Sequence, residues 1–260
     1  MNTRIHRLLD KPLLLLGTAD RFEIGLVAAT AAFLLTGYLF KTVPSGFLPA
    51  EDQGYFMVET RLPDAASTGA ISAWRQWGEK YHPGLELTAE HHGKRAQDLV
   101  LQMVGEKLFK EADDFINNLE QDLAHLTVPL EGSVEFLTAM KPGVWTVVTS
   151  ANPNLARARL SAAGIPIPNE IVTAWDVENG KPHPEPYLKG AANLGFDISE
   201  CVVFEDAASG ILAGLEAGAG LLVGVTEHAF DTQADIVVRS LKGITFVDGE
   251  LVIPDSIRLR

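Results

Sequence analysis

Short apolar runs that alternate with helix-like segments limit the fold of this chain more than any other feature. The runs lie at residues 145–150 (WTVVTS), 170–176 (EIVTAWD), 201–206 (CVVFED) and 221–226 (LLVGVT). Helical patterns lie between or beside them at 154–164, 183–195 and 208–218. Unbroken apolar strands in this alternation are typical of a parallel sheet covered on both faces. The sequence therefore predicts an α/β fold whose ligands bind at the carboxyl ends of the strands.

The stretch from Thr68 to about residue 138 has a different pattern, with apolar residues three and four positions apart. Ala96, Leu99, Val100 and Met103 form one such series. This spacing places apolar side chains on one face of a helix. We expect helices at 71–81, 89–104, 111–126 and 132–140.

Charge and cysteine content exclude some classes of protein. The net charge of −13 argues against nucleic acid as a partner, because no basic stripe is available to neutralise phosphates. Cys201 is the single cysteine, so no intrachain disulfide can form, which suits a reducing compartment.

The first polar strand end is Thr149-Ser150-Ala151-Asn152. A serine there can offer its hydroxyl, together with the following backbone amides of Ala151 and Asn152, to a phosphate oxygen. The alternative interpretation is that Ser150 caps the helix that begins near Asn152.

Two further strand ends carry charged residues. Lys181 precedes Pro182, which restricts the lysine backbone to extended geometry and directs its ammonium, although a solvated loop lysine is the alternative. Glu205 and Asp206 end a buried strand, where adjacent acids are costly unless they are paired or bind a cation. Their oxygens suit Mg²⁺, and helix capping is the alternative role.

The order of these motifs resembles the haloacid dehalogenase (HAD) superfamily, in particular its phosphatases of the glycerol-3-phosphatase and 2-deoxyglucose-6-phosphate phosphatase type. VVTSA, NGKPHPEPYLKGA and VVFEDAASGILAG are similar to the second, third and fourth motifs of that group. The resemblance implies a Rossmann-like core with an inserted helical cap, a Mg²⁺ cofactor, a small phosphorylated metabolite as substrate and a cytoplasmic location. It gives Ser150, Lys181 and Asp206 catalytic roles and assigns the metal to Glu205 and Asp206. The stretch from His92 to Arg95 is similar to the H-G-x-R stretch of the cap, which implies that Arg95 reaches the substrate.

The first motif of that superfamily, a DxD loop that supplies the aspartate nucleophile and an acid/base, is missing upstream. At the usual spacing the sequence has Glu59-Thr60-Arg61. Glu59 would then take the nucleophile position with one methylene too many, and Arg61 would take the place of the acid/base although arginine effectively cannot release a proton. We therefore expect impaired phosphomonoester hydrolysis and weak Mg²⁺ binding. Tyr55 to Val58 is apolar and could form the missing central strand.

An uncharged apolar run, Ile24 to Phe40, lies near the amino terminus. As a helix, its 17 residues would span about 25 Å, the short end of what crosses a bilayer. Basic residues precede it and Glu51 and Asp52 follow, which favours a cytoplasmic amino terminus and possible inner-membrane anchoring. A buried core helix is the alternative.

Residues from about 22 to 67 resemble a fragment of resistance-nodulation-division efflux transporters, in which FLP-x-EDQG follows a transmembrane helix. The chain is far shorter than those transporters, so transport is not implied. We divide it into a basic lead with the apolar run and linker (1–54), a possible surrogate first strand (55–67), a helical cap (68–133) and a HAD-like core (134–260). Three hypotheses follow: an impaired phosphatase, a membrane-tethered binding module without activity, or a hybrid of two genes joined near Ser67.

Overall fold

A computed structural model describes residues 55–58, 64–86, 91–247 and 249–260. Its main feature is a six-stranded sheet in the order β3-β2-β1-β4-β5-β6, in which every neighbouring pair is parallel. The predicted parallel α/β sheet is therefore confirmed. The strands are β1 (Tyr55–Val58), β2 (Trp145–Val148), β3 (Ile171–Val172), β4 (Cys201–Glu205), β5 (Leu221–Val225) and β6 (Ile236–Val238).

Strand β1 lies in the middle of this sheet, within the segment for which the sequence predicts a transporter-like origin. It pairs with β2 on one side and with β4 on the other. Val58, its last residue, is in register with Val147 and with Phe204. The carboxyl end of β1 therefore lies at the same sheet edge where Ser150 follows β2 and Glu205 ends β4.

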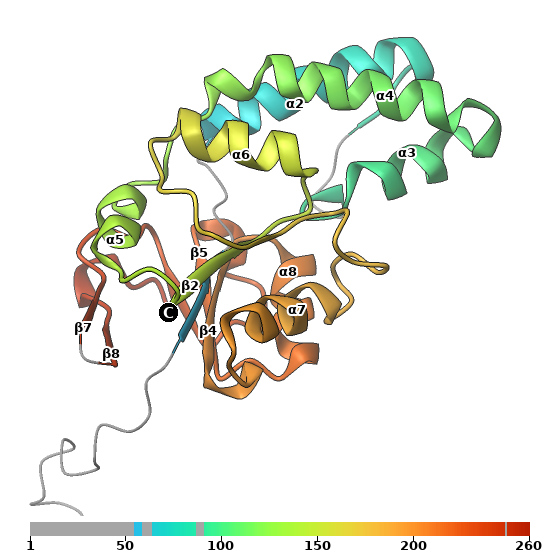
Figure 1. Ribbon diagram of the computed structural model, residues 1–260. Helices are drawn as coiled ribbons and strands as arrows, with labels where there is room; N and C mark the ends of the chain where they lie inside the picture. The colour runs from blue at the N-terminus through green and yellow to red at the C-terminus, as the bar shows by residue number, and fades with distance from the viewer. Residues whose placement is uncertain (1–54, 59–63, 87–90, 248) are drawn as a thin grey trace, which may run out of the picture. The chain divides into compact units, whose positions relative to one another are not determined.

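Alternate residues of the strands on either side of β1 enter different hydrophobic cores, as the period of two in a strand requires. In β4, Val202 and Phe204 belong to one core, whereas Cys201 and Val203 belong to the other. The first core includes side chains of α5 (Ser133–Ala139) and α6 (Pro153–Ala162), and the second includes side chains of α7 (Glu185–Leu194) and α8 (Ala208–Ala217). The sheet is thus covered on both faces, which explains its unbroken apolar strands (Figure 1).

A separate group of helices, called the cap below, consists of α2 (Asp64–Tyr81), α3 (Ala96–Val104), α4 (Glu106–Asp122) and the short 3-10 helix η3 (Ala124–Leu126). It has its own core, in which Trp77 is fully buried and donates an indole N–H to the carbonyl of Ala112 at 2.9 Å. Figure 1 shows α2 and α4 packed together, with α6 of the sheet domain next to α4.

The helix expected over 89–104 begins only at Ala96. Gly93 has a positive φ of 78°, and Arg95, the N-cap residue, has extended backbone geometry (φ −70°, ψ 137°). These two residues end the turn that precedes the helix, and residues 91–95 form a loop that faces the sheet domain.

The remaining elements are short. Short 3-10 helices occur at Ile198–Glu200 (η4), Glu227–Ala229 (η5) and Asp255–Ile257 (η6), and Thr245–Val247 (β7) pairs antiparallel with Glu250–Val252 (β8). Within the described residues, no helix has the length and apolar character needed to cross a membrane. The apolar run at 24–40, predicted as an N-terminal helix, and residues 59–61 lie outside the described residues.

Candidate active site

Four of the predicted site residues come from three segments and meet at the carboxyl edge of the sheet. Ser150 follows β2, Glu205 ends β4 and Asp206 comes directly after it. Lys181 comes from the loop between β3 and α7, and its side chain reaches the ends of both β2 and β4. The structure therefore brings Lys181 and Glu205 into direct contact.

The Lys181 ammonium lies 2.9 Å from Oε2 of Glu205 and 3.3 Å from the carbonyl oxygen of Val148. Lys181 is 3% exposed and Glu205 is 1% exposed, so the ion pair is almost completely removed from water. Breaking such a pair by removing one partner would leave an uncompensated buried charge, which costs about 3–5 kcal/mol. The alternative of a solvated loop lysine does not agree with this burial.

A third residue of this cluster, Tyr187, was given no role by the sequence analysis. It lies on α7, is completely buried and donates its hydroxyl to Oε2 of Glu205 at 2.7 Å. The Lys181 ammonium also lies 4.7 Å from the centre of the Tyr187 ring. The sequence feature that could have indicated this role is its position, six residues after Lys181 and in the first turn of α7. A side chain there can face back toward the strand ends.

Glu205 uses both of its carboxylate oxygens in hydrogen bonds to the protein. Oε2 accepts from Lys181 and Tyr187, whereas Oε1 accepts from the backbone N–H groups of Asp206 and Ala207 at 3.0 and 2.8 Å. Burial works to raise the pKa of Glu205, but Lys181 and these hydrogen bonds outweigh it and hold the pKa below its usual range. Glu205 is therefore an ionised group that positions its neighbours.

These contacts bear on the predicted Mg²⁺ site. Both oxygens of Glu205 are engaged by protein donors, and the other carboxylate at this strand end, Asp206, is 8% exposed. Across the described part of the chain, no group of three or more His, Cys, Asp or Glu side chains is arranged to hold a metal ion. The described residues therefore do not make a complete Mg²⁺ site.

Ser150 contacts the cap. Its hydroxyl donates to the carbonyl of Gly93 at 2.6 Å, and Ser209 at the start of α8 donates similarly to the carbonyl of His92 at 2.9 Å. Asn152, not Ser150, is the N-cap of α6, because its Oδ1 accepts the N–H of Leu155 at 2.9 Å. The alternative role of Ser150 as a helix cap is therefore wrong, and two hydroxyls of the sheet domain hold the 91–95 loop.

Arg95 lies beside this contact and is 8% exposed. Its Nε and Nη2 donate to the two oxygens of Asp98 at 2.7 and 2.9 Å, and its Nη1 donates to the carbonyl of Val177 at 3.2 Å. A Cβ atom at Gly180 would come within 2.7 Å of Arg95 Nε. Arg95 thus connects the cap to the loop that carries Lys181, and it is not among the residues that line the cavity described next.

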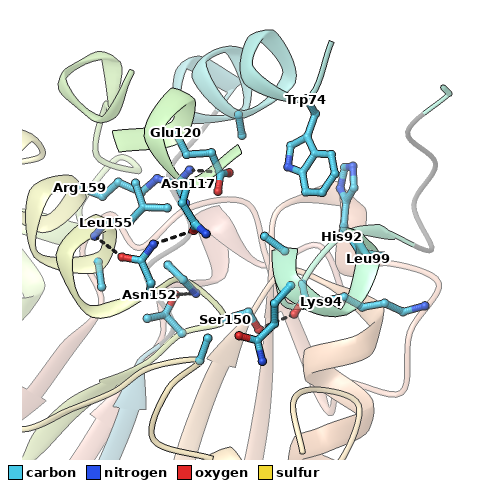
Figure 2. Close-up of a pocket in the computed structure, with 18 of the residues that line it drawn as sticks. Trp74, His92, Lys94, Leu99, Asn117, Glu120, Ser150, Asn152, Leu155 and Arg159 are labelled. Carbon is cyan, nitrogen blue, oxygen red and sulfur yellow. Dashed lines mark hydrogen bonds and ion pairs between the residues drawn. The ribbon is translucent and has the colours of Figure 1, made fainter. Parts of the chain in front are cut away.

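A cavity of about 360 Å³ lies between α2, α3 and α4 of the cap and the end of β2 with α6. Ser150, Ala151 and Asn152 line its sheet side. Figure 2 shows Asn117 and Asn152 joined on one wall, while Trp74, His92 and Leu99 lie on another. A space of this size is in the range of small-molecule sites.

A parallel sheet under a group of helices, with a buried lysine–carboxylate pair at the strand ends, places the chain among α/β proteins of the Rossmann-like type. A profile of the haloacid dehalogenase-like hydrolases matches residues 58–218. The chain therefore belongs to this family, and the predicted resemblance is confirmed.

Curated relatives agree with this assignment. Hexitol phosphatase A of Escherichia coli is 37% identical over 196 residues, which cover 70% of this chain and 89% of the relative. Glycerol-1-phosphate phosphohydrolase 2 of Saccharomyces cerevisiae is 33% identical over 199 residues, or 68% and 78% of the two chains. The 2-deoxyglucose-6-phosphate phosphatase 2 of the same yeast is 30% identical over 216 residues, or 70% and 85%.

Solved structures show the same fold. A β-phosphoglucomutase from Clostridium difficile superposes with a TM-score of 0.61 at 23% identity, covering 72% of this chain and 91% of the other. A hydrolase from Pseudomonas syringae gives 0.58 at 24% identity, with 69% and 87% covered.

Proposed function

We propose that this chain binds small sugar or polyol phosphates at the carboxyl ends of β2 and β4, and that it hydrolyses them poorly. The observation that supports binding is the buried Lys181, which Glu205 holds at 2.9 Å beside Asp206. A fixed cation at the edge of a parallel sheet attracts an anionic group. The names of the relatives, hexitol phosphatase and glycerol-1-phosphate phosphohydrolase, support phosphorylated polyols as the ligand class.

The proposed impairment rests on the residues that follow β1. Glu59, Thr60 and Arg61 come directly after Val58, where the family resemblance implies the DxD nucleophile loop. Loss of a nucleophile costs a well-studied protease on the order of 10⁶ in turnover, equal to about 8 kcal/mol of barrier. A loss of similar size would make turnover here difficult to detect.

Mg²⁺ is the cofactor that the family implies. Asp206 is the residue of this chain that would hold Mg²⁺. The positive charge of the metal ion would help to neutralise a bound phosphate. Because both oxygens of Glu205 are engaged by protein donors, we expect weaker Mg²⁺ binding than at a site where both carboxylates could bind the metal.

Phosphate release from sorbitol 6-phosphate and glycerol 1-phosphate tests this proposal on the purified full chain, with and without MgCl₂. We expect wild-type turnover no higher than that of Asp206→Asn. The double variant Glu59→Asp, Arg61→Asp restores the DxD pattern, and we expect it to exceed wild type by about 10³-fold or more.

Two results would contradict the proposal. Wild-type turnover well above the Asp206→Asn background would show that the chain is an active phosphatase. A double variant that folds, binds no phosphate ester and remains inactive would remove the phosphate site itself.

The second candidate is a membrane-tethered binding module without catalytic activity, supported by the missing DxD pattern and the apolar run at 24–40. It predicts that the full chain sediments with membranes, whereas a variant with Leu26→Glu and Leu34→Glu does not. Recovery of both proteins in the supernatant would remove the tether and leave a location in the cytoplasm.

A further inference from the structure

We propose that Asp113, on helix α4 of the cap, is a specificity-determining residue that accepts a hydrogen bond from a hydroxyl group of the ligand. This inference rests on the proposed function, because it assigns the part of the ligand that is not phosphate. The observation behind it is a series of hydrogen-bonded polar side chains that leads from α6 to α4 along the wall of the cavity.

The hydrogen-bonded series begins at Asn152, whose Oδ1 is held by a backbone N–H group. Asn152 Oδ1 accepts the N–H of Leu155 as the N-cap of α6, so its amide nitrogen must point the other way. That nitrogen donates to Oδ1 of Asn117 at 2.8 Å (Figure 2). The orientation of the Asn152 amide therefore determines the orientation of the Asn117 amide across the domain boundary.

Asn117 in turn donates to Asp113, which lies one turn earlier on α4. With its oxygen occupied, Asn117 presents its nitrogen to Asp113, and this nitrogen donates to Oδ2 of Asp113 at 3.0 Å and to the Asp113 carbonyl at 2.8 Å. The amide groups of Asn152 and Asn117 both donate in the direction of Asp113. The series consequently ends at the carboxylate of Asp113, which in its ionised form can only accept hydrogen bonds.

The other oxygen of Asp113, Oδ1, is buried and has no hydrogen-bond partner within the described part of the chain. Asp113 also lines the cavity. A buried acceptor without a donor costs about 1–3 kcal/mol, and burial also raises the pKa of this carboxyl, together with the neighbouring charge of Asp114. A ligand hydroxyl donating to Oδ1 would remove that cost.

Charge determines which end of a ligand fits here. Asp113 would repel a phosphate, whereas the lining of the same cavity also includes Ser150, at the end of β2, and Lys94. The second acid on this wall, Glu120, is buried and paired with Arg159 at 3.2 Å, so it is already supplied with a donor. A phosphorylated polyol would therefore place its phosphate at the strand ends and its hydroxyls toward α4.

Calorimetric titration of the full chain in EDTA tests this, since without metal the ligands stay intact. The probes are sorbitol 6-phosphate, n-hexyl phosphate, which has the same number of carbon atoms but no hydroxyls, and inorganic phosphate. We expect wild type to prefer the sorbitol ester over the hexyl ester, and Asp113→Ala to reduce this ratio of dissociation constants about tenfold, the equivalent of one hydrogen bond to a charged group.

Two further variants make the result decisive. Asp114→Asn removes the same charge from an exposed neighbour that pairs with Lys110, and the ratio should remain at the wild-type value. Asp113→Asn keeps the size of the side chain and an oxygen that can accept from Asn117. If the alanine variant unfolds, this variant still tests the role of Asp113, and it should also reduce the ratio.

The outcomes separate the inference from the proposed function. An unchanged ratio in both Asp113 variants, with normal phosphate binding, overturns the role of Asp113 and leaves the proposed function standing. Binding of none of the three probes to wild type overturns the proposed function, and the inference fails with it.

Discussion

The hydroxyl of Ser150 donates a 2.6 Å hydrogen bond to the backbone carbonyl of Gly93, which joins the end of β2 to the cap. The hydroxyl has a single proton, so it cannot donate to a phosphate oxygen and to Gly93 at the same time. Binding of phosphate at Ser150 and docking of the 91–95 loop therefore compete for one donor.

We predict that inorganic phosphate at saturation increases deuterium uptake of the 91–95 loop in wild type. Ser150→Ala should raise the uptake without phosphate, lower the free energy of unfolding by about 1 kcal/mol, and remove the response to phosphate. Ser161→Ala, which changes an exposed serine of α6, is the control. Protection of the loop by phosphate in wild type would contradict this competition.

Tyr187 supports the charge of Glu205, which gives a prediction with a definite pH dependence. We expect Tyr187→Phe to lower the free energy of unfolding at pH 7 by about 1.5–3 kcal/mol, the value of a hydrogen bond to a charged group. Because the pKa of Glu205 is lowered in the folded state, this contribution is complete above the unfolded value of about 4.3 and is lost as the pH falls through the folded value.

Urea unfolding from pH 7 down to about pH 4 measures this difference, which should begin to shrink at the acidic end. Tyr81→Phe is a matched control, since its hydroxyl contacts the exposed Glu111 at 2.8 Å and should contribute much less. A loss that is the same at every pH would show that the Glu205 charge is not what Tyr187 stabilises.

Gly210 gives a steric test of the same cluster. A Cβ atom there would lie 2.0 Å from Glu205 Oε2, so Gly210→Ala must displace the carboxylate from Lys181. We expect a loss of about 3 kcal/mol in the free energy of unfolding and weaker binding of inorganic phosphate. Gly214→Ala meets the movable end of Leu222 at 2.6 Å and should affect stability without affecting phosphate binding. Equal phosphate affinity in all three proteins would exclude Lys181 and Glu205 from the phosphate site.

Arg95 was expected from the resemblance to reach the substrate, whereas its contacts suggest that it positions the Lys181 loop. Arg95→Lys cannot keep the paired bonds to Asp98 together with the bond to Val177. We predict increased deuterium uptake at 177–181 with little change in phosphate affinity. If phosphate affinity falls as much as in Gly210→Ala, the substrate-binding role is the correct one.

The order of motifs along the chain was enough to predict the sheet and the residues at its carboxyl edge. Unbroken apolar strands require cover on both faces, and polar residues at their ends must meet at one edge, so Ser150, Lys181 and Asp206 could be named from local patterns. The family assignment followed from the same residues and is confirmed. The transporter-like origin of residues 22–67 and the role of Glu59 remain predictions.

The partners of these residues could not be predicted, because each partner comes from a distant part of the chain. Whether Glu205 binds a metal or a lysine depends on Lys181 and Tyr187 folding against it, and nothing near Glu205 in the sequence contains that information. The same holds for Ser150, whose bond to Gly93 joins residues 57 positions apart, and for Asp113, whose orientation depends on Asn152. The sequence by itself determined which chemical groups reach the edge of the sheet, because strand patterns are local. Only the tertiary structure decided which of those groups are already engaged, because hydrogen bonding depends on distances that arise when the cap and the sheet domain pack together.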